Sequence, residues 1–506
     1  MKIARKIGVV LIVWAWCRPI AAADQYWAYR YHQIDVTAQG SADYARTLAH
    51  NLYRLDLSIA AVLQSKASQW RAPTEVYAVP ADLFTDFTGQ KADIASHSSA
   101  TSFNSTILIN TSVNGENRYW QVYFGFGSSV LGAAYSFRYP QWFIAGLSEV
   151  FAASSVERTH VIIGGASPGR VYTLLRGTWI PIQTLLSTRW SDPQMSSKDF
   201  REMYYAETWY LVHKIVIDQF YHTNFHHYFE RLDRGEDEAS AFSGSFDLSI
   251  EDLDRAFKKT ISGDKFQQLK VTVADEDDGS KAVRLSEAEA KGRLAVYAAE
   301  HGVQPGSALV LSAAALKLDA ANEDALTARV RAELRVSDPN TAFRDANDMC
   351  GRETLSTKLL RTCAFAFATL AHKQRDKALP GGSETELNSK ALKFYENEVL
   401  LDPEDLQSWH GLATLAYAVH DVEYAKALLP KIAAVQAAHP HVGSLAGSVA
   451  GLYSLAGDDD NAMKYALTWQ ANSISSGERG MAVAYISRLR DYSERKRAAG
   501  GANLPN

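Results

Sequence analysis

The sequence is poor in cysteine and has no excess of basic residues. Its 506 residues include three cysteines, and 52 Lys and Arg stand against 57 Asp and Glu. A protein that holds nucleic acid through its phosphates needs a basic surface, so this balance argues against a nucleic-acid partner. Apolar residues make up 47% and charged residues 22%, which is typical of a globular protein. The length allows two or more hydrophobic cores.

Long apolar runs are also missing beyond the N-terminus. After residue 23, no segment is apolar over the roughly 20 residues that span a bilayer, so we expect no transmembrane segment in the mature chain. Residues 1–23 carry basic residues, then an apolar run from Ile7 to Cys17, then three alanines. This order predicts a signal peptide cleaved after Ala23. A membrane anchor is disfavoured because the run is too short, and we expect a periplasmic or secreted protein.

Only Cys350 and Cys363 remain after this cleavage. In an oxidising compartment, two neighbouring cysteines predict one local disulfide, and the alternative is a pair of buried thiols. Neither His nor a second Cys pair lies close enough in the sequence to suggest a metal-binding cluster.

A change in composition near residues 271–290 divides the chain. The acidic segment 271–284 contains Gly and Ser and is typical of a linker. Strand-like and helical segments alternate before it, whereas Ala and Leu dominate after it. We therefore expect an α+β domain at 24–270, helical repeats at 285–497 and a disordered tail at 498–506.

The C-terminal half has a repeat period. Ala391, Ala425 and Ala462 lie 34 and 37 positions apart, and aromatic and small residues recur around them. A period near 34 is that of tetratricopeptide repeats, in which small residues let paired helices approach closely. An irregular helical bundle is the alternative. Either arrangement predicts a surface that binds a protein or peptide partner.

Three segments of the N-terminal half carry a family resemblance. They are HQIDVTAQGSADYARTLAHNL near the start, YPQWFIAGLSEVFA in the middle, and YYAETWYLVHKIV with GSFDLSIEDLDRAF at the end. In this order they resemble the gluzincin group of zinc metallopeptidases, relatives of thermolysin-like and aminopeptidase-like enzymes, over roughly residues 25 to 262. The resemblance implies an α+β gluzincin-like fold.

Residues expected in such enzymes are absent here. The family's HExxH helix supplies two zinc ligands and a general base, and a following W-x-x-E-G-x-A-E-Y pattern supplies a third ligand. Trp142 and Gly146 match the second pattern, but Ala145 stands at its ligand position. The family's spacing places Val122 and Phe126 where the histidines belong and Tyr123 where the base belongs, and no His lies between His97 and His160. The resemblance therefore implies a lost zinc site, and we expect no metal or other cofactor.

The remaining candidates for chemistry are few. Glu149 matches the later acidic position of the pattern, and Tyr204 and Tyr205 correspond to a segment that borders the cleft in active relatives. A lone carboxylate is more often a helix-surface or hydrogen-bonded structural group than a catalyst. His222, His226 and His227 include a helical i, i+4 spacing but have no adjoining acidic or Cys partner, so a surface cluster is favoured. The glycines of IIGGASPGRVY lack a P-loop ending and indicate a loop before a helix.

These observations lead to one functional expectation and one alternative. We expect an exported, non-catalytic peptidase-like protein with helical repeats that acts as an interaction or scaffold factor in the bacterial cell envelope. The alternative is a divergent periplasmic hydrolase that acts on peptide or glycan, with Glu149, Tyr204 and Tyr205 as cleft residues.

Overall fold

The computed structural model describes residues 25–62, 73–113, 116–135, 140–218, 222–234, 236–246, 249–263, 265–274, 279–336, 339–374 and 382–501. The predicted signal peptide, residues 275–278 of the predicted linker and residues 502–506 lie outside these ranges. Within the described part of the chain, no helix is both long enough and apolar enough to cross a membrane.

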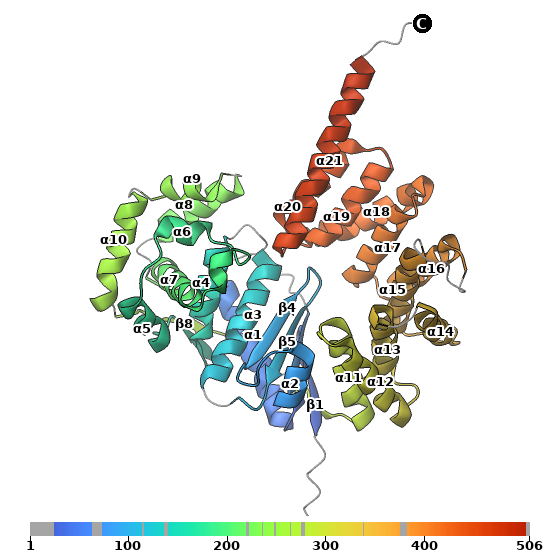
Figure 1. Ribbon diagram of the computed structural model, residues 1–506, viewed down its shortest axis with the longest axis horizontal. Helices are drawn as coiled ribbons and strands as arrows, with labels where there is room; N and C mark the ends of the chain where they lie inside the picture. The colour runs from blue at the N-terminus through green and yellow to red at the C-terminus, as the bar shows by residue number, and fades with distance from the viewer. Residues whose placement is uncertain are drawn as a thin grey trace, which may run out of the picture.

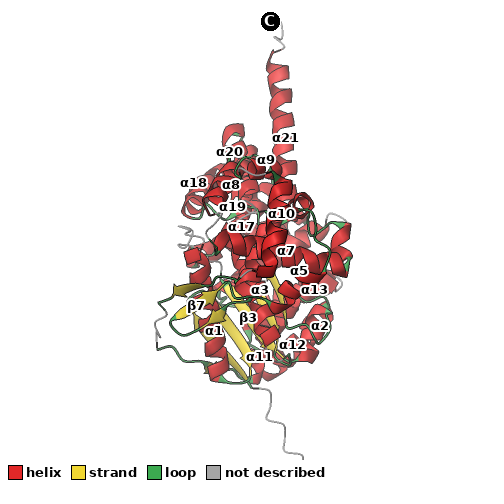
Figure 2. Ribbon diagram, turned by 90° about the vertical axis from the view of Figure 1, so that its left-hand side faces the viewer, coloured by secondary structure: helices red, strands yellow, loops and turns green. Residues whose placement is uncertain are grey.

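A mixed six-stranded sheet organises the N-terminal region (Figures 1 and 2). Its order is β4-β5-β3-β2-β1-β9, with β2, β3 and β5 parallel and the other neighbours antiparallel. The strands are β1 (Tyr26–Tyr31), β2 (Ile34–Gln39), β3 (Thr74–Val79), β4 (Ser96–Ala100), β5 (Ser105–Asn110) and β9 (Val283–Arg284).

One face of this sheet is apolar and belongs to the largest core. Successive side chains of a strand point to opposite faces, and Ile34, Val36 and Ala38 of β2 and Val76 and Ala78 of β3 all lie in that core. Helix α1 (Ala42–Val62) packs on this face through Leu48, Leu52, Leu55 and Ile59, which recur at helical spacing. Helix α3 (Glu116–Tyr135) lies beside it, against β4 and β5.

A helical group continues the same core away from the sheet. It comprises α4 (Gln141–Ala152), α5 (Pro168–Arg176), α6 (Ile182–Ser187), η3 (Pro193–Ser196), α7 (Lys198–Val216), α8 (His222–Asp233), α9 (Glu238–Ser243), α10 (Ile250–Thr260) and η4 (Ile261–Gly263). A small antiparallel sheet, β6 (Ser155–Val156), β7 (His160–Ile163) and β8 (Leu269–Thr272), lies beside this group.

The C-terminal region is helical throughout its described residues after β9. Its helices are α11 (Glu287–Glu300), α12 (Pro305–Leu318), α13 (Glu323–Val336), α14 (Pro339–Cys350), α15 (Thr357–Gln374), α16 (Glu384–Leu401), α17 (Leu406–Ala418), α18 (Val422–Ala438), α19 (Gly443–Leu455), α20 (Asp459–Ala471) and α21 (Ser476–Gly501). Capping boxes begin α11, with Ser286 and Glu289, and α16, with Ser383 and Glu386. The helices pack in pairs, and α21 runs outward from the last pair (Figure 1).

The two regions share a hydrophobic core on the second face of the sheet. Tyr297 of α11 packs against Tyr77 of β3 and against Phe87 of α2 (Ala81–Thr88), with ring centroids 5.2 and 5.4 Å apart. A second contact lies at the β4–β5 connection, where Phe103 packs against His410 and Ser102 lies within hydrogen-bonding distance of Ser444. The regions therefore form a continuous body.

The α+β fold expected for the first half is seen as a region of mixed strands and helices around a six-stranded sheet, and the helices of the second half pack in pairs as expected. The segment expected as a linker begins within β8 and ends with β9, which pairs with β1. Helix α21 continues to Gly501, past residue 497 at which the sequence places the end of the repeats.

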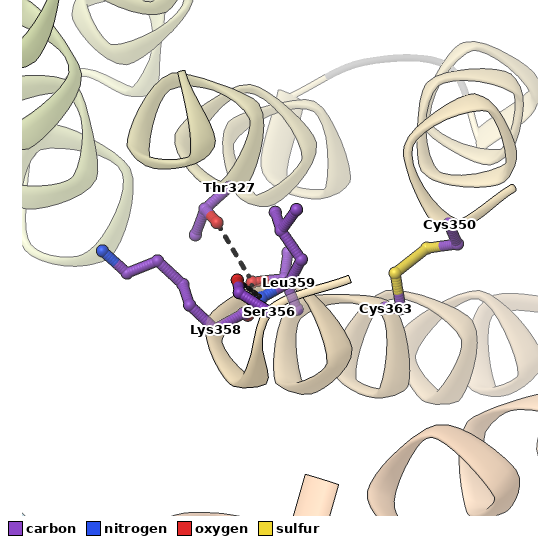
Figure 3. Close-up of a disulfide and its surroundings, with 7 residues drawn as sticks. Thr327, Cys350, Ser356, Lys358, Leu359 and Cys363 are labelled. Carbon is purple, nitrogen blue, oxygen red and sulfur yellow. Dashed lines mark hydrogen bonds between the residues drawn. A yellow bond between two sulfur atoms is a disulfide. The ribbon is translucent and has the colours of Figure 1, made fainter. Parts of the chain in front are cut away.

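The disulfide expected from the sequence joins the end of α14 to α15 (Figure 3). Cys350 and Cys363 are 13 residues apart, and their Cα atoms lie 5.8 Å from each other. Cys363 is fully buried, so the bridge holds α14 against the core of the helical region.

Removing this bridge should destabilise the helical region. We expect the double variant Cys350→Ala, Cys363→Ala to lose about 2–3 kcal/mol of unfolding free energy, because a bridge over a loop of this length restricts the unfolded chain. Chemical denaturation followed by circular dichroism measures the loss. Reducing agent should weaken the wild-type protein equally and leave the variant unchanged, and a wild-type protein insensitive to reduction would contradict the bridge.

Candidate functional site

Helices α3, α4 and α7 form the stack in which the resemblance places the lost zinc site. Val122 and Phe126 of α3 are each 1% exposed, and Ala145 of α4 is fully buried. All three belong to the same continuous core, together with Tyr123. The structure thus brings these positions into one apolar interior that supplies no metal-ligating side chain from any of them.

Small residues allow these helices to approach closely. A Cβ on Gly146 of α4 would lie 2.2 Å from the carbonyl oxygen of Thr208 in α7, so only glycine fits at this crossing. On the other side of α4, Ser128 of α3 donates a hydrogen bond to Ser148 Oγ at 2.9 Å, and Ser148 donates to the carbonyl of Ile144. The glycine of the family-like pattern is therefore explained by packing alone.

Glu149 is fully buried and is held by an arginine that the sequence analysis did not single out. Arg170 of α5 donates from Nε to one carboxylate oxygen at 3.0 Å and from Nη2 to the other at 2.5 Å. Burial raises the pKa of Glu149 to about 7, and Arg170 acts in the opposite direction. Each carboxylate oxygen of Glu149 therefore accepts one hydrogen bond from Arg170.

Aromatic rings surround the Arg170 guanidinium. Its carbon lies 5.4 Å from the ring centroid of Trp120 and 5.6 Å from that of Tyr205, distances that allow cation–π attraction. Phe124 stacks on Trp120 and meets Tyr205 edge to face. We call Glu149, Arg170, Trp120 and Tyr205 the Arg170 cluster.

The two tyrosines from the sequence analysis have different surroundings. Tyr205 joins the Arg170 cluster, and burial together with the Glu149 charge raises the pKa of its phenol. Tyr204 is fully buried, and burial raises the pKa of its phenol well above the usual range. The structure therefore brings Glu149 and Tyr205 together through Arg170 and leaves Tyr204 as a core residue beside them.

Two histidines of α8, His226 and His227, lie on the surface, whereas the side chain of His222 lies outside the described part of the chain. Each of the two lies within 4 Å of Glu230, at 3.9 and 3.3 Å, so the expectation that no acidic partner adjoins them is wrong: Glu230 follows them by one helical turn. No group of three or more His, Cys, Asp or Glu side chains is arranged to hold a metal ion within the described ranges.

Glu207 of α7 is a second buried carboxyl that sequence reasoning missed. It accepts a hydrogen bond from the backbone N–H of Ile180 at 2.5 Å, and burial raises its pKa to about 8. Its position one residue before Thr208, beside the Gly146 crossing, gives it a structural role in fixing the segment before α6. The signal in the sequence was one acidic residue within the largely apolar and aromatic run MYYAETWYLV of α7.

Comparisons with known proteins add no identity to this geometry. No protein-family model matches the chain, and no curated protein matches it significantly.

The buried pair of Glu149 and Arg170 should couple strongly in stability. We expect Arg170→Gln to cost about 3–5 kcal/mol at pH 8, because it leaves the Glu149 carboxylate buried without its partner. Glu149→Gln should cost less, because the raised pKa of Glu149 means that a neutral side chain is favoured there in the folded protein. The double variant should cost less than the sum of the two single variants. The pKa of Glu149 is about 7 in the folded state, against 4.5 as the usual value. The free energy of unfolding should therefore fall as the pH rises from 4.5 to 7 and Glu149 becomes charged in the unfolded chain first. Arg170 makes this loss smaller than burial alone would. The coupling energy should be larger at pH 8 than at pH 5.

The matched control is the more exposed pair of Arg189 and Glu238, whose closest atoms are 3.0 Å apart. Its coupling energy should stay below about 1 kcal/mol at both pH values. Equal coupling energies for the two pairs, measured by urea denaturation, would refute the structural role given to the Arg170 cluster.

Proposed function

We propose that this protein is an exported, non-catalytic relative of gluzincin peptidases whose tetratricopeptide-like repeats bind a protein or peptide partner in the bacterial cell envelope. The observation that carries the proposal is the burial of Val122, Phe126 and Ala145 in one apolar core. A zinc enzyme of this group needs three ligands and an open fourth position at the corresponding places.

The physical argument concerns what can be stable in that interior. A metal ion and its carboxylate and imidazole ligands stay in a protein interior when they satisfy one another, whereas Val and Phe side chains gain free energy from burial. When apolar residues replace all the ligands together, the polar metal site becomes part of the apolar core. The helix crossing at Gly146 is needed by the packed arrangement whether or not a metal is present.

The repeat assignment is supported by equivalent roles at equivalent spacing. Asp421 and Asp458 each cap the second helix of a pair, through the backbone N–H groups of Tyr424 and Asn461. The spacing of 37 positions between these two aspartates equals that between Ala425 and Ala462. Gly411 lies too close for a Cβ to Tyr395 of the preceding helix α16, and Gly447 to Trp469 of the following helix α20, so these two glycines hold different places in their pairs.

The alternative function, a divergent hydrolase, depends on the Arg170 cluster. A pKa of about 7 suits a general acid or base, but the Glu149 carboxylate is fully buried and held at both oxygens. A catalytic role would require a substrate to reach this fully buried carboxyl group. The non-catalytic proposal needs no such access.

The first test of the proposal is metal content together with turnover. We expect protein purified without chelator to contain no stoichiometric zinc and to cleave no member of a broad peptide library, because the three ligand positions offer no donor atoms. Elemental analysis and mass spectrometry of the library measure both. Zinc at one atom per chain with chelator-sensitive turnover would replace the proposal with the hydrolase alternative. Loss of that turnover in a folded Glu149→Gln variant would place the hydrolase site at the Arg170 cluster.

The second test locates the partner surface on the repeats. Leu400 of α16 and Met481 of α21 are 77% and 58% exposed, and Leu175 of α5 in the N-terminal region is 53% exposed. We expect Leu400→Glu or Met481→Glu to weaken in-cell cross-linking to an envelope protein, because a charge on an apolar contact opposes its burial. Leu175→Glu is the matched control and should have no effect. Loss of the cross-link with Leu175→Glu alone would move the partner site to the N-terminal region.

A further inference from the structure

A polar cavity lies between the sheet and the C-terminal helices, away from the Arg170 cluster. Its volume is about 480 Å³, within the usual range for small-molecule sites. The sheet contributes residues of β2 and β3, and the helices contribute residues of α11, α13 and α15. Both regions of the chain are therefore needed to form it.

The sheet wall of this cavity is acidic. Asp35 of β2 and Glu75 of β3 are direct neighbours in the parallel register, on the face opposite the largest core. Adjacent like charges on a sheet face destabilise it unless cations offset them. Arg293 of α11 donates a hydrogen bond to Asp35 at 2.9 Å and so neutralises one of the two carboxylates.

Glu75 is the carboxylate of this pair that has no direct ion-pair partner in the described part of the chain. It accepts a hydrogen bond from the Tyr77 hydroxyl at 2.9 Å, and it forms no ion pair with any residue in the described ranges. Burial, followed by the nearby charge of Glu300, raises its pKa. A cationic group placed in the cavity would relieve both effects.

The helical wall of the cavity is basic. Arg331 of α13 pairs with Glu300, and Arg361 of α15 pairs with Asp405. Each guanidinium has five N–H donors, and the Nε of both arginines is buried with no hydrogen-bond partner in the described structure. Lys358 of α15 adds a third cation to the lining, where it pairs with Asp324 of α13. Its charge acts to lower the pKa of Glu75, against the larger effect of burial.

An aromatic ring stands beside these charges. Phe365 of α15 lines the cavity and is 41% exposed, and the Arg331 guanidinium lies 5.3 Å from its ring centroid. A partly exposed ring next to a cation offers an apolar contact to a ligand that also carries an anionic group.

We propose that the cavity binds a small zwitterion, a free amino acid or short peptide, with its ammonium group at Glu75 and its carboxylate at Arg331 and Arg361. The acidic wall accounts for the ammonium group, the basic wall for the carboxylate, and Phe365 for an apolar side chain. The mixture of both signs disfavours a polyanion, and a polyamine would leave the basic wall without a partner. This inference goes beyond the proposed function and does not depend on the repeat partner.

The test uses the full mature chain and defined ligands. Isothermal titration calorimetry compares the tripeptide Ala-Phe-Ala with free termini, its N-acetylated form, its C-amidated form, free phenylalanine and spermidine. We expect the free tripeptide or free phenylalanine to bind, which distinguishes a peptide from an amino acid as the source. Each capped tripeptide should bind at least about tenfold more weakly than the free one if the peptide is the ligand, because it leaves a charged group of the cavity unmatched.

Two variants and a control connect binding to the named residues. Glu75→Gln should weaken binding at least about tenfold without lowering the melting temperature, because it removes an uncompensated charge and keeps an acceptor for Tyr77. Phe365→Ala should weaken binding of phenylalanine-containing ligands more than that of Ala-Ala-Ala. Glu423→Gln, at an 83% exposed side chain of α18, is the matched control.

Several results would overturn the inference. They are the absence of binding by every zwitterion, equal binding of the free and capped tripeptides where the free tripeptide binds, tighter binding of spermidine, and unchanged affinity in Glu75→Gln. None of these results bears on zinc content, turnover or cross-linking to the repeats, so failure here is distinguishable from failure of the proposed function.

Discussion

The alternation of side chains along β2 and β3 is the constraint on which the rest of the structure depends. Ile34, Val36 and Val76 point into the largest core, so Asp35 and Glu75 must point to the opposite face. A register shift of one residue would place both carboxylates in the apolar core. The first face thereby requires covering by α1 and α3, and the second face requires a cover that is apolar at one end and polar at the other.

Helix α11 meets this second requirement. Tyr297 packs against the apolar end of the face, where Tyr77 and Phe87 lie, and Arg293 reaches the acidic end at Asp35. Tyr297 follows Arg293 by four positions, so both lie on one side of the helix. Because α11 also begins the C-terminal region, the position of the following helices relative to the sheet is set by this contact.

Sequence reasoning reached the parts of this arrangement that depend on local pattern. Composition and periodicity predicted strands and helices in the first half and paired helices in the second. The closeness of the two cysteines in the sequence predicted the disulfide. Arg170 and Glu207 escaped sequence reasoning, because a buried ion pair or a buried carboxyl is defined by contacts between distant segments. The acidic wall left a weak signal, since IDVT of β2 and TEVY of β3 each hold one acidic residue among β-branched and aromatic residues. Nothing in either segment indicates that the two strands are neighbours or that arginines of α13 and α15 face them.

The distribution of charge between the two sites has a common physical cause. Glu149, which is buried inside one region, is held by a bidentate arginine from the same region. Where carboxylates lie between the regions, as at Asp35 and Glu75, the cations come from α11, α13 and α15, and the match is incomplete. A core closed within one region can satisfy its charges permanently, because its helices are fixed by apolar packing on all sides. A cavity whose walls come from two regions retains donors and an acceptor that a ligand can satisfy. Binding there would also stabilise the contact between the two regions, since the ligand binds only when both walls are in place.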